Sequence, residues 1–85
     1  MTSLLSYVAV VSIDYDSATP PYQQLAAIIR GRIEAGEITA RLPGETTLQQ
    51  EFGLALATVR KAVKVLRDEG LVRTVPGWGS YVTKR

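Results

Sequence analysis

The stretch LATVRKAVKVLRDEG, residues 56–70, says most about the fold. Its apolar residues recur every three or four positions, as on one face of a helix. That apolar stripe consists of Val59, Ala62, Val63 and Leu66. The basic residues that line up nearly opposite, at i, i+4 and i+7, are Arg60, Lys64 and Arg67. The stretch therefore predicts an amphipathic helix with one cationic face, ended by Gly70.

A second, shorter helix is predicted immediately before it, from about Glu45 to Phe52. Leu48 and Phe52 are four residues apart and would share its buried face, and Gly53 would end it. Two helices joined by a short turn, the second of them cationic, form the helix-turn-helix arrangement. We expect this unit to occupy about residues 45–64.

The flanking segments complete a single domain over residues 20–85. An earlier helix is predicted after Pro20 and Pro21, with Gly36 as its stop. Its apolar stripe consists of Tyr22, Leu25, Ala26, Ile29 and Ile33. A connector with a brief extended segment before Pro43 follows. LVRTV (71–75) and SYVT (80–83) read as strands joined by PGWG, so a β-hairpin is expected at about 71–83. The expected fold is mainly α with a small β-hairpin, a three-helix winged helix-turn-helix.

Residues 1–19 form an N-terminal arm whose apolar run, Leu4–Ile13, is rich in β-branched residues. We interpret it as a strand: either a dimerisation segment or a third strand of the wing sheet within one subunit. The run lacks a basic flank, precedes Asp14 and Asp16, and is too short to span a bilayer. The apolar run is therefore not expected to be a signal peptide. We expect no membrane partner and a cytoplasmic location.

Charge and composition narrow the function. The net charge is +2, but residues 1–53 carry three basic and six acidic side chains, whereas residues 54–85 carry seven basic and two acidic ones. The positive charge of residues 54–85 indicates either a surface that binds a polyanion or a basic surface that is merely solvated. The chain has no cysteine and no histidine, and it shows no nucleophile–base pair. We therefore expect no metal, no cofactor and no enzymatic activity.

Several pieces in order and spacing resemble the DNA-binding domain of the GntR family of bacterial transcription regulators. They are PPYQQLAAIIRGRIEAGEI, LPGE, FG, ATVRKAVKVLRDEGLV and PGWGSYV, from about Pro21 to Val82. The resemblance implies a transcription regulator, a repressor rather than an activator, bound as a homodimer to double-stranded operator DNA. The cationic helix would enter the major groove and the wing would meet the minor groove. It also implies a large C-terminal effector domain, which this chain does not contain.

The resemblance assigns roles to individual residues. Arg60 matches the recognition-helix arginine that contacts a base edge or a phosphate; a solvent-exposed charge is its alternative reading. Thr58 matches a phosphate-binding hydroxyl, and Gly77 matches the glycine at the wing tip. Lys61 and Lys64 suit phosphate contacts, which position a protein without specifying sequence. The predicted DNA-binding set is Thr46, Leu56, Ala57, Thr58, Arg60, Lys61, Lys64, Arg73, Gly77 and Trp78.

The chain also departs from the family pattern. LPGET stands where LPSER is usual, so Gly44 replaces a capping serine and Thr46 replaces an arginine that would contact DNA. Ala55 cannot cap the cationic helix through its side chain. Leu56 stands where a second arginine is frequent, and it either packs beneath the turn or faces thymine methyl groups in the major groove. Both readings predict weaker or more degenerate base readout.

The sequence allows more than one interpretation of Trp78, of Arg67 and of the function of the chain. Trp78 packs on the wing near Tyr81, or touches a minor-groove sugar or a dimer partner. Arg67 pairs with an acid of its own helix or contacts DNA. The apolar LALA turn (residues 54–57) and Trp78 would also suit a winged-helix protein-interaction module with little DNA binding. A salt titration separates these functions, because DNA binding weakens steeply with ionic strength.

Overall fold

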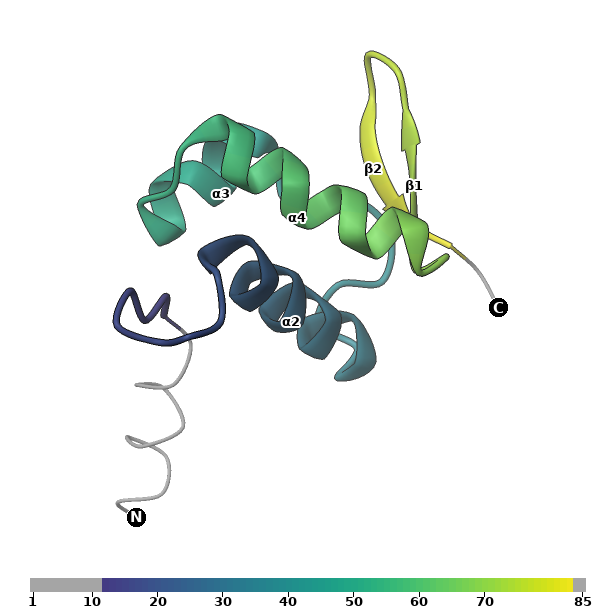
Figure 1. The fold of residues 1–85 in the computed structure, drawn as a ribbon. Helices are drawn as coiled ribbons and strands as arrows, with labels where there is room; N and C mark the ends of the chain where they lie inside the picture. Colours follow the sequence, from purple (N-terminus) through teal and green to yellow (C-terminus); the bar gives the residue numbers. More distant parts are fainter. Residues whose placement is uncertain (1–11, 84–85) are drawn as a thin grey trace.

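The computed structural model describes residues 12–83. It contains helices α2 (Pro21–Glu34), α3 (Glu45–Phe52) and α4 (Leu56–Asp68), followed by strands β1 (Val72–Val75) and β2 (Gly79–Val82) (Figure 1). The predicted order of three helices and a hairpin is confirmed. Nearly all of the apolar run at residues 4–13 lies outside the described residues; Ile13 is described and packs against the core.

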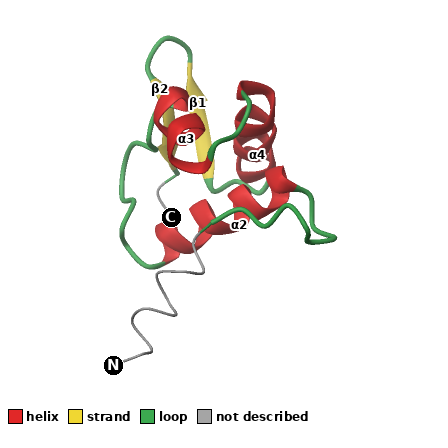
Figure 2. Ribbon diagram, turned by 90° about the vertical axis from the view of Figure 1, so that its left-hand side faces the viewer, coloured by secondary structure: helices red, strands yellow, loops and turns green. Residues whose placement is uncertain are grey.

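Helix α4 lies at the centre of the domain. It contacts α2, α3 and β1, and the hairpin rises beside its C-terminal end (Figure 1). Figure 2, turned by 90°, shows α2 lying beneath the rest of the domain. Val59, Ala62 and Leu66 of α4 are completely buried, so the predicted apolar stripe forms the centre of the core. The other core side chains are Leu25, Ala26, Ile29, Leu42, Leu48, Phe52, Leu54, Leu71 and Val72.

The turn between α3 and α4 uses a left-handed glycine. Gly53 has φ +65°, and the N–H of Leu54 donates to the carbonyl of Gln49 at 3.1 Å, which closes α3. Gly44 and Ala55 occupy the N-cap positions of α3 and α4 with extended backbone and no side-chain cap. Both helices therefore depend on packing rather than on capping side chains for their first turns.

The wing is a two-stranded antiparallel hairpin with Val72 opposite Val82 and Thr74 opposite Ser80. The connector between α2 and α3 runs alongside β2 and pairs with it through an isolated β-bridge between Arg41 and Tyr81. The N–H of Val82 donates to the carbonyl of Ala40 at 2.7 Å, and that of Leu42 donates to the carbonyl of Ser80 at 2.9 Å. The extended segment predicted before Pro43 is thus confirmed, and it holds the base of the wing.

The segment before α2 is held to the domain by hydrogen bonds. The Gln24 amide donates to the carbonyls of Asp14 and Thr19, both at 2.7 Å, and accepts from the N–H of Asp14 at 2.8 Å. The hydroxyl of Tyr15 donates to the carbonyl of Gly53 at 3.3 Å, next to the helix-turn-helix turn. None of the helices within residues 12–83 has the length and apolar character needed to cross a membrane.

Two glycine substitutions test this backbone. Gly53→Ala should lower the free energy of unfolding by about 1 kcal/mol, because an L-residue is strained at positive φ. Gly31→Ala, on the exposed side of α2, should raise it by about 0.5–1 kcal/mol through helix propensity. A new Cβ meets no atom within 4 Å at either position, so sterics do not confound the comparison. Urea unfolding followed by circular dichroism measures both; effects of equal sign would contradict the left-handed turn.

Candidate nucleic-acid interface

An open groove of about 740 Å³ separates α4 from the wing. One wall is the exposed face of α4, the other is the hairpin from Thr74 to Ser80, and the start of α3 closes one end. Leu42, Leu48 and Val63 contribute its apolar floor. The groove therefore combines the two elements that the sequence assigned to DNA binding.

The groove is strongly cationic. The basic side chains that line it are Arg41, Arg60, Lys61, Lys64 and Arg67, and among the described residues Glu45 is its single carboxylate. Elsewhere the arginines of α2 are neutralised: Arg30 forms a two-pronged ion pair with Glu69, and Arg32 pairs with Glu51. The hydrogen bond from Arg30 lowers the pKa of Glu69. Unbalanced positive charge is thus concentrated on one face.

The helical period explains which α4 side chains reach the groove. Positions 60, 61, 64 and 67 are exposed and line the groove, while 59, 62 and 66 are buried on the opposite side. Position 57 is also exposed but does not line the groove. The burial of Val59, Ala62 and Leu66 therefore orients Arg60, Lys61 and Lys64 outward. The predicted cationic face is present, and Ala57 continues it into the first turn.

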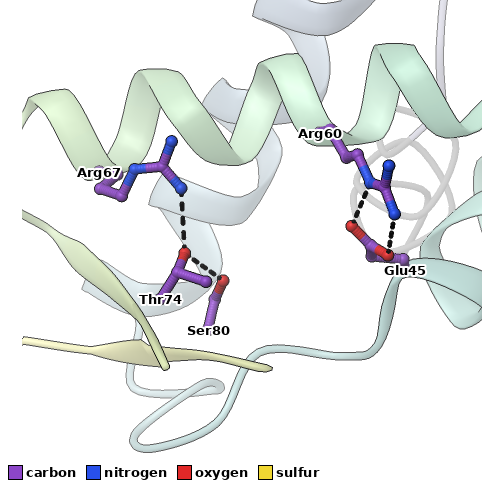
Figure 3. Close-up of polar contacts among 5 residues, drawn as sticks. All are labelled: Glu45, Arg60, Arg67, Thr74 and Ser80. Atoms are coloured by element: carbon purple, nitrogen blue, oxygen red, sulfur yellow. Dashed lines mark hydrogen bonds and ion pairs between the residues drawn. The ribbon is translucent and has the colours of Figure 1, made fainter. Parts of the chain in front are cut away.

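Arg60 is held by the first turn of α3 (Figure 3). Its Nε lies 2.8 Å from Oε2 of Glu45, and its Nη2 lies 3.2 Å from Oε1. This hydrogen bond lowers the pKa of Glu45 and raises that of Arg60. Both side chains are largely exposed, so the pair orients the guanidinium more than it stabilises the fold. Arg60 is therefore a positioned cation rather than a freely solvated one.

Arg67 connects α4 to the wing. Its Nη1 donates to Oγ1 of Thr74 at 3.1 Å, and Thr74 is hydrogen-bonded to Ser80 across the hairpin at 3.1 Å (Figure 3). The sequence left Arg67 either an intrahelical partner or DNA. Its hydrogen bond goes to the wing, while in its own helix the pKa of Asp68 is lowered by the hydrogen bond from Lys64 at 2.8 Å and also by the nearby charge of Arg67. The i to i+4 spacing favours the lysine, while Arg67 lies close enough to reach β1.

The remaining cation of the α4 wall is Lys61. Its Nζ lies 4.2 Å from the ring centroid of Tyr22, so the first turn of α2 supports it through a cation–π contact. Lys61 and Lys64 both remain exposed beside the groove. Their chemistry suits phosphate oxygens rather than base edges.

The first turn of α4 is apolar and partly open. Leu56 and Thr58 are half-buried and Ala57 is exposed. Leu54 is buried in the core, whereas Leu56 is half-buried. Both readings of Leu56, packing beneath the turn and facing the major groove, therefore stay predictions.

The wing tip presents Gly77 and Trp78 to the groove. Gly77 has φ +78°, as the tight turn requires. Trp78 is 68% exposed, which disfavours one of the readings that the sequence left open, packing against the wing near Tyr81. Tyr81 lies within β2 opposite Arg73, whereas Trp78 lies in the turn with its indole exposed.

Five residues of the predicted DNA-binding set do not line the groove: Thr46, Leu56, Ala57, Thr58 and Arg73. Leu56, Ala57 and Thr58 form the first turn of α4, which precedes the groove-lining residues of that helix. Thr46 is exposed on the first turn of α3. Arg73 is opposite Tyr81 in the hairpin register, on the face away from Thr74 and Ser80. Conversely, the sequence did not single out Arg41, Glu45, Thr74 or Ser80. Their importance depends on contacts between segments, which no local pattern encodes.

The Arg60–Glu45 pair predicts a measurable pKa change. In Arg60→Gln the pKa of Glu45 should rise toward its ordinary value, because the charged hydrogen-bond donor is lost. Since the folded-state pKa lies below the unfolded one, the pair's small stabilisation is present above the unfolded pKa and is lost as pH falls through the folded value. Carboxyl NMR titration measures this; an unchanged Glu45 pKa would contradict the pairing. Arg30→Gln is the control that should leave Glu45 unaffected.

Comparison with known proteins agrees with this geometry. The family model described as bacterial regulatory proteins, gntR family, matches residues 21–82. The chain is 40% identical over 65 residues to the mannosyl-D-glycerate transport/metabolism system repressor MngR of Escherichia coli (strain K12), covering 74% of this chain and 27% of that protein. It is 33% identical over 76 residues to the HTH-type transcriptional repressor NagR of Bacillus subtilis (strain 168), covering 87% of this chain and 31% of that protein.

Solved structures show the same fold. YtrA from Sulfolobus acidocaldarius, a GntR-family transcription factor, matches with a TM-score of 0.79 and 33% identity over 89% of this chain and 82% of that one. The DNA-binding domain of AraR in complex with operator ORX1 matches with a TM-score of 0.77 and 30% identity over 85% of this chain and 95% of that one. This chain thus spans under a third of the two curated relatives and most of these two solved domains. It belongs to the GntR family of bacterial regulatory proteins.

Proposed function

We propose that this chain binds double-stranded operator DNA and acts as the DNA-binding part of a transcription repressor. The observation that carries the proposal is the groove between α4 and the wing, with five cations and one carboxylate. A duplex offers a dense row of phosphates to such a surface, and the major groove admits an α-helix. The operator complex of the AraR domain supports the same use of this fold.

The exposed face of α4 supplies the proposed major-groove contacts. Arg60, held by Glu45, would meet a base edge or a phosphate, and guanine is the base that arginine best recognises. Lys61 and Lys64 would meet phosphates, with Thr58 adding a hydroxyl. Leu56 and Ala57 offer only apolar surface, which suits thymine methyl groups. With few polar base-reading groups, we expect a degenerate site that depends partly on DNA shape.

The wing supplies the proposed minor-groove contact. Gly77 allows the backbone to approach closely, and Trp78 presents an apolar surface beside it. Apolar side chains can lie against sugars or partly open base steps in this groove. Thr46, Leu56, Ala57, Thr58 and Arg73 do not line the α4–wing groove, so their contacts rest on the resemblance to the family and stay predictions.

We further propose that the DNA-bound form is a homodimer on two related half-sites. Two protomers double the number of phosphate contacts, and their spacing adds specificity that a short recognition helix lacks. The matched region covers 27% and 31% of the two repressors, so the proposal concerns DNA binding by that region alone. A protein-interaction module without DNA binding is not favoured, given the repressor relatives and the operator-bound neighbour.

Selection from a random duplex pool at two salt concentrations tests the function. We expect enrichment of a paired motif at low salt and a steep loss of affinity as salt rises, because bound phosphates release counterions. Fluorescence anisotropy on the selected duplex gives the affinity. Absence of enrichment, or binding that does not respond to salt, would contradict operator recognition.

The matched variants for that experiment are Arg60→Gln and Arg30→Gln, which remove the same charge from opposite faces. Arg60→Gln should weaken binding by about 1–3 kcal/mol if it reads a base, and should relax selection at one position. Arg30 lies outside the groove and pairs with Glu69, so its loss should change affinity little. Equal losses would indicate a nonspecific charge effect.

Trp78 offers a direct optical test, because it is the chain's only tryptophan. Its emission should change on addition of the selected duplex, and the change should reverse at high salt. Trp78→Ala should weaken DNA binding by about 1–2 kcal/mol, five- to thirtyfold in Kd, through lost apolar contact. Because the indole is 68% exposed, the free energy of unfolding should barely change. A large stability loss with unchanged affinity would show instead that Trp78 packs within the domain.

A further inference from the structure

The wing wall of the groove is neutral. Its residues from Thr74 to Ser80 include no ionisable side chain, whereas the α4 wall carries Arg60, Lys61, Lys64 and Arg67. A duplex lying on both walls would present phosphates to each of them. The hairpin itself therefore supplies no cation where one would be most useful.

Arg41 brings a cation to that wall from another part of the chain. Its backbone forms the bridge to Tyr81, and the neighbouring hydrogen bonds from Val82 and Leu42 tie the connector to β2. The guanidinium extends along the strand to Gly79: Nε and Nη2 lie 3.1 and 3.4 Å from where a Cβ on Gly79 would be. The missing side chain at Gly79 leaves the space that the guanidinium occupies, next to Trp78.

The charge of Arg41 is uncompensated. It is exposed, and no carboxylate lies within ion-pair distance of it among residues 12–83. Arg60 and Lys64, on the opposite wall, each share their charge with an acid. Arg41 is thus a cation lining the groove, placed by the backbone of the wing and available to an external anion.

We propose that Arg41 is a phosphate-binding residue of the wing, contacting the DNA backbone beside the point where Trp78 meets the duplex. This inference rests on the proposed DNA binding. The planar fork of five N–H donors matches phosphate oxygens, and the guanidinium lies in the space that a side chain at Gly79 would fill. Arg41 would thus link the connector and the wing, which are paired through its backbone, to a DNA phosphate bound by its side chain. Such a contact positions the wing without reading the base sequence.

The test compares the salt dependence of binding for the 85-residue chain and three variants: Arg41→Gln, Arg41→Lys and Arg30→Gln. Arg30 is the matched control, because it does not line the groove and is not one of the predicted DNA-binding residues. Arg41→Gln and Arg30→Gln lose the same charge. Thermal unfolding checks that each variant folds as the wild type does.

For Arg41→Gln we expect a slope of log affinity against log salt that is shallower by about 0.9 per bound protomer, the value for one lost phosphate contact. At about 0.15 M salt this corresponds to a roughly fivefold weaker affinity, equal across operator variants because no base is read. Arg41→Lys should keep most of the slope, and Arg30→Gln should leave it unchanged. Phosphate ethylation interference should lose one site in Arg41→Gln only.

The outcomes separate this inference from the function on which it rests. A wild-type complex with steep salt dependence and an unaltered Arg41→Gln overturns the role of Arg41 alone. Equal changes in Arg41→Gln and Arg30→Gln also overturn it, because overall charge would then account for both. Failure of the wild type to bind any duplex overturns the proposed function and this inference with it.

Discussion

The structure depends on the packing of one face of α4 in the core. Val59, Ala62 and Leu66 are fully buried, and α2, α3 and β1 all contact the helix that carries them. Because the helix is rigid, burying this stripe also decides which residues face solvent on the opposite side. The orientation of Arg60, Lys61 and Lys64 is thus a consequence of core packing. A substitution that rotated α4 in the core would displace every one of these cations together.

Most of the fold could be predicted from the sequence because its signals are local. The bounds of α3 coincide with the predicted Glu45–Phe52, since paired apolar residues and a glycine stop act within one helix. The strands agree to within a residue, because the glycine turn fixes their register. The exposed stripe of α4 follows from helical period alone. These elements are consistent with their tertiary surroundings, so propensity and packing point the same way.

The site was less predictable, because its detail lies in contacts between distant segments. Arg60 meets Glu45 fifteen positions earlier, and Arg67 meets Thr74 across the helix–wing junction. Arg41 reaches the groove only because the connector pairs with β2. For Leu56 and Trp78 the sequence left two readings each, because neither has a local pattern that decides its surroundings. The structure leaves Leu56 half-buried beside the buried Leu54, and it leaves the indole of Trp78 68% exposed.

These contacts make the helix and the wing one recognition unit. Arg67 joins α4 to Thr74, Thr74 joins Ser80, and the connector holds the base of β2, so the hairpin has a defined position relative to α4. A fixed separation between two binding elements adds selectivity for duplexes whose grooves have matching spacing, without any further base contact. This selectivity for groove spacing offsets the low base specificity expected of an α4 face with few base-reading groups. Sequence preference in this chain would then arise as much from the geometry between its two elements as from the side chains on either one.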